Sequence, residues 1–241
     1  MLATKDTTLI GDSYLLLAHD VLEYAERYAK VFSDPLFEEC NIILDNSVIE
    51  LGSSVSAETL LKAADIVNAN VIAMPDVLLD GPETFKASLA FYESLIEEDK
   101  FRSYMFIPQG KTFEEWCNCL ELAFEHDLPL DWIGIARNTT NRIVHSRKAL
   151  VAYASTLEPG AQIHLLGFSD NPQDDITTIV DMGKHIASID SAVPVRYPGV
   201  YTRDSADPGP RGDWWEKAEW SAQVAENIMC ARSIFEEDVL Y

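Results

Sequence analysis

The feature that most restricts the fold of this chain is a repeated alternation of short apolar segments with amphipathic ones. Each apolar run has the length of a buried strand, and a stretch with helical periodicity follows most of them. Six such strands are expected to begin near residues 41, 71, 104, 132, 163 and 186. Two less regular apolar segments, residues 7–11 and 14–19, precede them. Buried strands that alternate with helices form parallel sheets, so the pattern predicts an α/β fold, a (β/α)8 TIM-type barrel.

Helix signals fill the intervals between these strands. Ser56 can cap one helix, and Thr112 with Glu115 forms a capping box for another. Pro82 and Pro172 stand where further helices should begin. The inward faces are expected to carry Phe85, Leu89, Tyr92 and Ile96 after Pro82, and Ile176, Ile179 and Val180 after Pro172. An open doubly wound sheet is the alternative, although it more often carries a glycine-rich phosphate loop after its first strand, and none is visible here.

The end of the chain has a different character. Residues 197–213 contain three prolines, three glycines and mixed charges, which predicts a mobile loop. Residues 214–236 predict a closing helix that packs on the barrel. There is no internal repeat or low-complexity tract, so one domain spanning residues 1–241 and including both segments is expected.

Composition limits the classes of function. No apolar run approaches the roughly 18 residues of a membrane span, and the first residues lack the pattern of a secretory signal, so a cytoplasmic location is expected. Cys117 and Cys119 fall within a helical pattern without a second pair at zinc spacing, so no metal is expected. The formal net charge of −22 repels phosphates, so any contact with nucleic acid needs a local basic patch, a partner protein or a strand drawn into the site.

Polar residues follow several of the predicted strands. The carboxyl ends of barrel strands converge on one face, where the chemistry of such enzymes takes place. The residues delivered there are Asp45, Asp76, Gln109, Gly134, Ala136, Gly167 and Asp190. Carboxylates and an amide around an apolar mouth suit a planar, polar heterocycle, while glycines admit close backbone contacts. Each Asp, taken alone, could equally be a cap or turn residue.

Several short motifs, in the same order, resemble those of the tRNA-guanine transglycosylases. Residues 189–196, Ile-Asp-Ser-Ala-Val-Pro-Val-Arg, resemble that family's nucleophile segment, Phe-Asp-Cys-Val-x-Pro-Thr-Arg. Further matches lie at residues 44–47, 71–76, 106–110, 134–136 and 164–172. Ser47 and Val48 replace two glycines of the family's Asp-Ser-Gly-Gly segment, so the backbone there is expected to differ. The zinc subdomain that follows the nucleophile in that family is absent, which makes the chain most similar to the compact phage branch, the DeoxyPurine in DNA protein A group.

The resemblance implies roles for individual residues. Asp190 would be the nucleophile and Asp45 the general acid and base. Asp76, Gln109 and Gly110 would contact the base through side chains and backbone, together with Gly134, Ala136 and Gly167. Arg196 would hold a flanking phosphate. No cofactor is implied.

The expected activity is therefore exchange of guanine in DNA for a 7-deazaguanine, 7-cyano-7-deazaguanine or a derivative, through a covalent glycosyl-enzyme. DNA and the free base would be its partners, with a helper protein for DNA binding, in the host cytoplasm if a phage encodes the chain. Two alternatives stay open. One is the same reaction on tRNA or hydrolysis of a glycosidic bond, and the other is a catalytically silent acidic scaffold or DNA mimic.

Overall fold

The computed structural model describes residues 13–97, 99–137, 147–167 and 172–190, together with Glu226 and Met229, except for the side chains of residues 172–174 and 176. The described part contains a sheet of seven parallel strands. Its strands are β1 (Ser13–Leu17), β2 (Asn41–Asp45), β3 (Val71–Ala73), β4 (Ser103–Phe106), β5 (Trp132–Ala136), β6 (Gln162–Leu166) and β7 (Ile186–Ile189).

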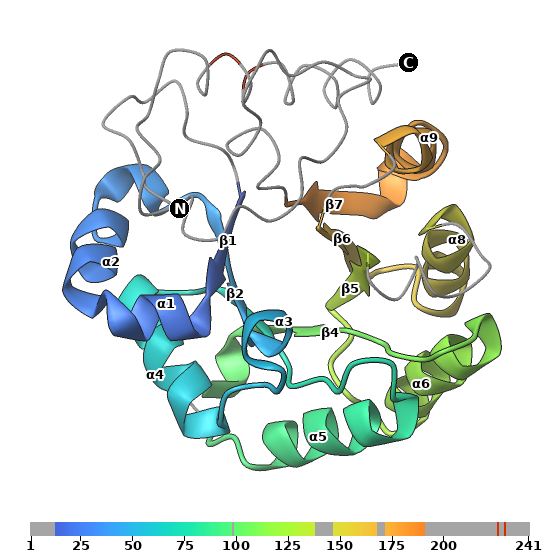
Figure 1. Ribbon diagram of the computed structural model, residues 1–241, viewed down its shortest axis with the longest axis horizontal. Helices are drawn as coiled ribbons and strands as arrows, with labels where there is room; N and C mark the ends of the chain where they lie inside the picture. Colours follow the sequence, from blue (N-terminus) through green and yellow to red (C-terminus); the bar gives the residue numbers. More distant parts are fainter. Residues whose placement is uncertain are drawn as a thin grey trace.

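The strands lie in the sheet in the order of the sequence, and each pairs in parallel with the next. Together they curl nearly into a barrel with the helices outside it (Figure 1). A doubly wound sheet would reverse its strand order, so that alternative is wrong for this sheet. All six main predicted strands are confirmed, and the predicted segment at residues 14–19 overlaps β1. The segment at residues 7–11 lies outside the described residues.

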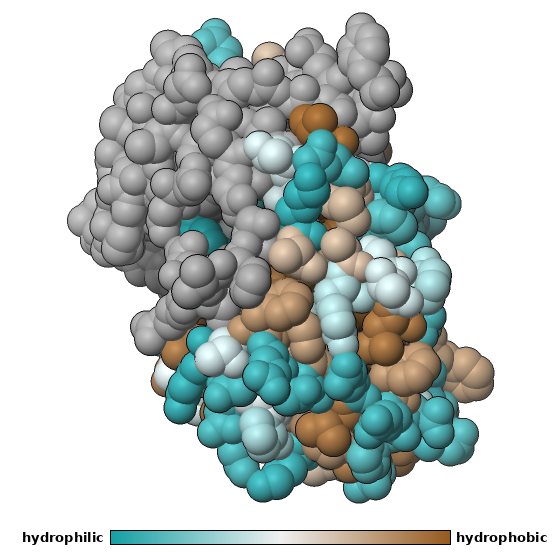
Figure 2. All heavy atoms as spheres, turned by 90° about the vertical axis from the view of Figure 1, so that its right-hand side faces the viewer, coloured by the Kyte–Doolittle hydropathy of each residue, from teal (hydrophilic) through white to brown (hydrophobic). Residues whose placement is uncertain are grey.

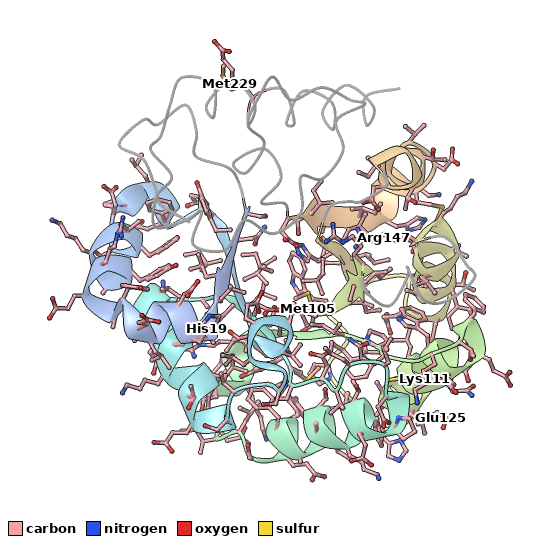
Figure 3. The ribbon with its side chains drawn as sticks, viewed as in Figure 1. His19, Met105, Lys111, Glu125, Arg147 and Met229 are labelled. Carbon is pink, nitrogen blue, oxygen red and sulfur yellow. The ribbon has the colours of Figure 1, made fainter. Side chains whose placement is uncertain are left out.

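Side chains that alternate along the strands divide the core into two apolar clusters. One fills the interior of the barrel, where Met105 lies (Figure 3). Its buried members are Ile43, Val71, Ala73, Met105, Ile107 and Trp132. The other cluster includes the outward-facing strand residues, such as Leu44, Ile72 and Phe106, packed against the helices. Strands buried on both faces explain why the sequence shows continuous apolar runs instead of alternation.

The helices follow the strands and cover the outside of the sheet (Figure 1). They are α1 (Ala18–Glu23), α2 (Ala25–Phe32), α3 (Val48–Leu51), α4 (Ala57–Val67), α5 (Gly81–Glu93), α6 (Phe113–Glu125), α8 (Arg147–Leu157) and α9 (Pro172–Met182), with short 3-10 turns at Pro35–Phe37, Asp99–Phe101 and Gly183–His185. The predicted caps are confirmed. Ser56 Oγ accepts the backbone N–H of Thr59, and Thr112 Oγ1 accepts that of Glu115. The Glu115 carboxylate accepts the N–H of Lys111, one residue before the cap, at 2.7 Å.

The inward face of α5 agrees with the prediction in part, because Phe85, Leu89 and Tyr92 are partly buried and pack against the outer cluster. Its buried residues include Thr84, Ser88 and Phe91, while Ile96 lies beyond the helix end and is 62% exposed. The hydroxyls of Thr84 and Ser88 make this possible, because they bond to backbone groups of the loop after β3. Hydrogen bonding to that loop thus buries two polar residues beside the apolar face that the periodicity indicates.

Helix α9 agrees with its prediction only in part. Ile179 is buried, whereas Val180 is 52% exposed and the prediction for it is wrong. The buried stripe of α9 includes Thr178 and Ile179, and the next residue, turned by a further angle of about 100°, lies outside that stripe. The predicted loop at residues 197–213 and closing helix at residues 214–236 lie outside the described residues.

The two cysteines of α6 are buried thiols. Burial raises the pKa of both Cys117 and Cys119 to about 11, so both are held as neutral groups. In the described part of the chain, no three His, Cys, Asp or Glu residues gather as a metal site would require. The helices described there include none with the length and apolar character to cross a membrane. Hydrophilic and hydrophobic residues are interspersed on the visible side that carries α6, α8 and α9 (Figure 2).

Candidate active site

The predicted site residues lie at the carboxyl ends of four strands. Asp45 is the last residue of β2, and Asp190 directly follows β7. Asp76 and Gln109 each lie three residues beyond the end of their strand, β3 and β4 respectively. Asp45, Asp76 and Gln109 are 9%, 3% and 1% exposed, whereas the side chain of Asp190 retains 25% of its surface. The parallel sheet thus brings three carboxylates and an amide to the same end of the barrel.

Asp45 is a buried carboxyl with a raised pKa. Burial is the main cause, and the nearby charges of Asp76, Glu50 and Asp190 add to it. The backbone N–H of Ser47, which donates to Asp45 Oδ2 at 2.8 Å, opposes the shift. The resulting pKa is about 7, so this carboxyl can both give and take a proton near neutral pH.

Ser47 holds the turn that follows Asp45 in an unusual conformation. Its φ of 64° is left-handed, a region that glycine enters easily and serine does not. Ser47 stands at one of the two positions where the motif quoted above has glycine, and it adopts a conformation that glycine favours. The Ser47 hydroxyl accepts the N–H of His19 at 3.3 Å, a bond that glycine could not offer.

Asp76 is fixed by two neutral amides. Asn46 Nδ2 donates to one carboxylate oxygen at 2.8 Å, and Gln109 Nε2 donates to the other at 2.6 Å. Burial raises its pKa to about 6, although these two bonds oppose the shift. Asn46 also donates to the carbonyl oxygen of Met74. Because neutral amides rather than cations hold Asp76, no positive charge lowers its pKa, which stays at about 6.

Gln109 holds Asp76 as well as lining the site. Its Oε1 accepts the N–H of Leu79 at 3.1 Å, while its Nε2 binds Asp76. Leu79 is itself left-handed, with a φ of 62°, and this conformation belongs to the turn that presents its N–H. The orientation of the Gln109 amide is therefore set from both ends, which gives the side chain a structural role that its position in the sequence did not indicate.

Asp190 has the opposite electrostatic environment. Gly167 N–H donates to its Oδ1 at 2.8 Å, and His164 Nε2 lies 3.2 Å from the same oxygen. Burial would raise its pKa, but the bonds to His164 and Gly167, with the charge of Arg147, outweigh burial and lower it below the usual value. Asp190 is consequently ionised throughout the range in which Asp45 titrates.

Arg147 supports this part of the site from behind. It begins α8, is 1% exposed, and extends toward β6 (Figure 3). Its guanidinium binds Asp175 at 3.2 Å and the carbonyl oxygens of Leu166 and Gly167. The residue whose N–H reaches Asp190 is therefore anchored through its own carbonyl. The sequence analysis did not single out Arg147, because its partners lie on other elements.

His164 and Asn46 are also site residues that the sequence analysis did not single out. His164 is 1% exposed and interrupts an apolar strand, which is the one signal that could have indicated it. Asn46 directly follows Asp45, but its bond to Asp76 spans 30 residues of sequence. Neither residue type is unusual in a core strand or a turn, so the sequence alone does not mark either one as a site residue.

The expected base-contacting glycines have different surroundings. A Cβ at Gly110 would lie 2.5 Å from the backbone nitrogen of Trp116, and one at Gly134 would lie 2.9 Å from Ile107 and Leu166 side-chain atoms. Packing alone therefore explains both. Gly167, with a φ of 66° and more open space, is the glycine that contacts a site carboxylate.

The remaining predicted positions are Ala136 and Arg196. Ala136 is the last residue of β5 and packs beside the interior cluster. Arg196 lies outside the described residues.

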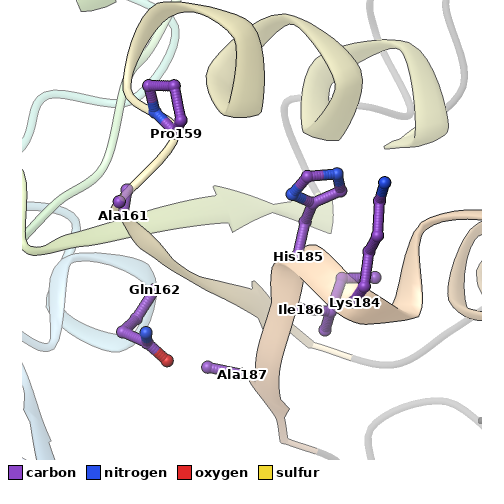
Figure 4. Close-up of a pocket in the computed structure, with 8 residues that line it drawn as sticks. Pro159, Ala161, Gln162, Lys184, His185, Ile186 and Ala187 are labelled. Carbon is purple, nitrogen blue, oxygen red and sulfur yellow. The ribbon is translucent and has the colours of Figure 1, made fainter.

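A small pocket of about 120 Å³ lies at the other end of the sheet (Figure 4). The amino ends of β6 and β7 line it, with Gln162, Lys184 and His185 among its residues. The carboxylates described above gather at the opposite ends of the strands, where barrels carry their chemistry. The pocket is therefore separate from the candidate site.

The arrangement has a clear chemical capacity. Two carboxyls, Asp45 and Asp76, exchange protons near neutral pH, while the third, Asp190, stays ionised. Environments that separate the pKa values of neighbouring carboxyls are how one site supplies both an acid and a nucleophile. The described residues can thus supply a proton donor and a carboxylate nucleophile at the same end of the barrel.

No protein-family model matches the chain, and no curated protein matches it. Solved structures do. β-Methylaspartase from Clostridium tetanomorphum, in a magnesium complex, matches with a TM-score of 0.54 and 11% identity over 98% of this chain and 55% of that chain. The BexX/CysO complex of Amycolatopsis orientalis matches with a TM-score of 0.49 and 11% identity over 97% of this chain and 81% of that one.

The present chain thus spans little more than half the length of the methylaspartase. At 11% identity, that likeness bears on the fold alone. Together with the strand order, it identifies the chain as an α/β protein, and the seven parallel strands of its described part curl nearly into a barrel compatible with the TIM type.

Proposed function

We propose that the protein exchanges guanine in DNA for a 7-deazaguanine, as a member of the tRNA-guanine transglycosylase superfamily close to its compact phage branch. The observation that carries the proposal is the separation of two pKa values at one end of the barrel. Asp45 has a pKa of about 7, while that of Asp190 is lowered. Base exchange requires an ionised nucleophile and a proton donor in the same site.

In the proposed reaction, Asp190 attacks C1′ of the target nucleotide and the bond from C1′ to guanine N9 breaks. The bonding electrons leave with guanine, which takes a proton from Asp45. Asp45 then accepts a proton from the incoming 7-deazaguanine, whose nitrogen attacks C1′ and releases Asp190. A pKa near 7 suits a group that must perform both transfers. The charges balance, because each half-reaction moves one proton and one glycosyl group.

Asp76 is proposed to bind the edge of the base. Its two amide partners keep it oriented without neutralising it by a cation. A guanine-like edge offers N–H donors, and a carboxylate that accepts them discriminates against bases without those donors. Gln109 then acts through Asp76, in addition to any contact of its own with the base.

The same proposal includes the complete barrel, the binding of DNA and the location of the reaction. In this proposal the fold is a (β/α)8 barrel in a single domain without the zinc subdomain of that family. Arg196 would bind a phosphate, and a helper protein would offset the repulsion between DNA and a chain of net charge −22. The target nucleotide must leave the stack or already be single-stranded, and the reaction would occur in the cytoplasm.

The test uses a single-stranded oligonucleotide with labelled guanine, in salt high enough to screen the repulsion. Release of guanine that requires 7-cyano-7-deazaguanine supports exchange, whereas release without it indicates hydrolysis. A denaturing gel of protein with labelled DNA detects the covalent adduct. The parent protein and Asp45→Asn should form it, the latter slowly, and Asp190→Asn should form none.

The control is Asp131→Asn, which removes a carboxylate from an exposed position. It should react like the parent protein. An adduct in Asp190→Asn that Asp45→Asn never forms would reverse the two assigned roles. Absence of both adduct and release with every DNA tested would favour the acidic scaffold.

A further inference from the structure

His164 occupies a position inside the barrel that apolar residues fill elsewhere. It pairs in register with Gly134 on β5 and with Ser188 on β7, so these residues share one face of the sheet. Neighbouring Ile163 and Leu165 face the helices and are buried in the outer cluster. An imidazole that is 1% exposed needs partners for both of its nitrogens, because a buried polar atom without a hydrogen bond is costly.

Both ring nitrogens of His164 have partners, one on β7 and one directly after it. Nδ1 lies 2.7 Å from Ser188 Oγ, and Nε2 lies 3.2 Å from Asp190 Oδ1. An ionised carboxylate only accepts hydrogen bonds, so Nε2 must carry a proton. The Ser188 hydroxyl can donate to Nδ1 of a neutral ring or accept from Nδ1 of an imidazolium, and in either form it fixes the ring in the orientation that lets Nε2 donate to Asp190.

These three residues are of the types found in a hydrolase triad, but their arrangement points elsewhere. In such a triad the serine meets the substrate and the carboxylate lies behind the histidine. Here Asp190 is at the strand end with 25% of its side chain exposed, whereas Ser188 is two residues earlier on the same strand. The hydrogen bonds run from the hydroxyl through the imidazole to the carboxylate, so the carboxylate is the end that meets a ligand.

The bonds also distinguish the two oxygens of the Asp190 carboxylate. His164 and Gly167 both donate to Oδ1. Within the described residues these are the donors that reach the carboxylate, so Oδ2 is left to react. On formation of a glycosyl ester through Oδ2, Oδ1 becomes the ester carbonyl oxygen. It then regains its negative charge when the ester is resolved, and the same two donors face that charge.

We propose that His164, oriented by Ser188, is a positioning residue that holds the Asp190 carboxylate by Oδ1 and directs Oδ2 toward C1′ of the substrate. This inference rests on the proposed role of Asp190 as nucleophile. It also assigns His164 to the second half-reaction, because a donor to Oδ1 makes the carboxylate a better leaving group. Resolution of the covalent adduct should therefore depend on His164 more than its formation does.

The charged and titratable groups around Asp190 come from several elements. His164 lies on β6 and Arg147 on α8, and the Asp45 carboxyl acts on it electrostatically from β2. Arg137, which follows β5, lies over Gly167 and adds a second guanidinium on this side. Of these groups, His164 makes a direct side-chain bond to Asp190, so its removal should change the titration of Asp190 most.

The first experiment is independent of activity. The protein is labelled with [γ-13C]aspartate, and the Asp190 signal is identified by its loss in Asp190→Asn. His164→Leu should raise the pKa of Asp190, His164→Gln should largely restore it because its Nε2 can still donate, and Ser188→Ala should raise it less than His164→Leu. The Asp45 signal, which titrates near pH 7, is the internal control for an intact site.

An Asp190 titration that stays the same in both His164→Leu and Ser188→Ala overturns the inference. Should His164→Leu fail to fold, Ser188→Ala, which deletes one hydroxyl, decides alone. The second experiment measures the lifetime of the covalent adduct after the incoming base is added. Loss of one hydrogen bond to a developing charge should lengthen it about tenfold in His164→Leu, with recovery in His164→Gln.

The two experiments separate this inference from the proposed function. If the His164 variants shift the Asp190 titration but the parent protein forms no adduct, the interaction between His164 and Asp190 is supported and the proposed exchange reaction is refuted. The role of His164 in resolving the adduct is then refuted as well. If the adduct has the same lifetime in His164→Leu as in the parent protein, base exchange is supported and the positioning role of His164 is overturned.

Discussion

Replacement of Asp45 by Asn should make the protein more stable at alkaline pH. The carboxyl has a pKa of about 7 in the folded protein, against 3.8 for an ordinary Asp, because burial disfavours its charge. The folded state therefore holds this proton more tightly than the unfolded state does. The stability that this group contributes is fully present below pH 3.8 and is lost as the pH rises through about 7.

The size of the effect follows from the two pKa values. At roughly 1.4 kcal/mol for each pKa unit, the change from 3.8 to about 7 corresponds to about 4 kcal/mol of stability lost above pH 7. Asn carries no charge at any of these pH values and has nearly the same shape. Its Oδ1 can still accept the N–H of Ser47, which now donates to Asp45. The variant should therefore avoid most of the loss without breaking the turn.

Urea unfolding of both proteins at several pH values from 4 to 8.5 measures the difference. The stability advantage of Asp45→Asn should increase with pH and level off above about pH 7. Asp190→Asn should behave in the opposite way, because the pKa of Asp190 is lowered and its contribution is present at neutral pH and lost in acid. The exposed Asp131→Asn is the control. An advantage for Asp45→Asn that does not change with pH would refute the reasoning.

Three further changes test the scaffold around the site by urea unfolding. Arg147→Met should lower the free energy of unfolding by about 3–5 kcal/mol, because it leaves Asp175 buried without the guanidinium that binds it. A loss below about 1 kcal/mol would contradict this. Gly110→Ala should lower the free energy of unfolding more than Gly160→Ala does. The Cβ added at Gly110 would lie 2.5 Å from a backbone nitrogen, whereas the one added at Gly160 would lie 3.6 Å from a side-chain oxygen. Thr112→Ala should cost about 1 kcal/mol through loss of the α6 cap, and an unchanged midpoint would show that the cap contributes nothing.

The sheet could be predicted because its information is local. A strand buried on both faces appears as a short apolar run, and the polar residue that ends it marks the carboxyl end of the strand. Asp45 and Asp190 could be placed at the same end of the barrel for this reason, before any contact was known. The burial of Thr84 and Ser88 on α5 could not be predicted, because it depends on hydroxyl bonds to a neighbouring loop, which periodicity does not reveal.

The interior of the site was less predictable because its bonds join distant segments. Asn46 reaches Asp76 across 30 residues, and His164 reaches Asp190 across 26. Nothing in the local sequence distinguishes an Asn that holds a carboxylate from one that ends a turn. The difference in pKa between Asp45 and Asp190 is likewise a property of the folded arrangement, since both begin as aspartates that end apolar strands.

The sequential strand order determines when the site is assembled during folding. Each strand pairs with the next one synthesised, about thirty residues later, so the sheet can grow by local steps. Asp45 belongs to the second strand of this series and Asp190 follows the seventh. A growing or truncated chain can thus build most of the sheet while these two carboxyl groups are still apart. They come to the same end of the barrel only when the sheet has curled, so the activity proposed above would report the completion of folding.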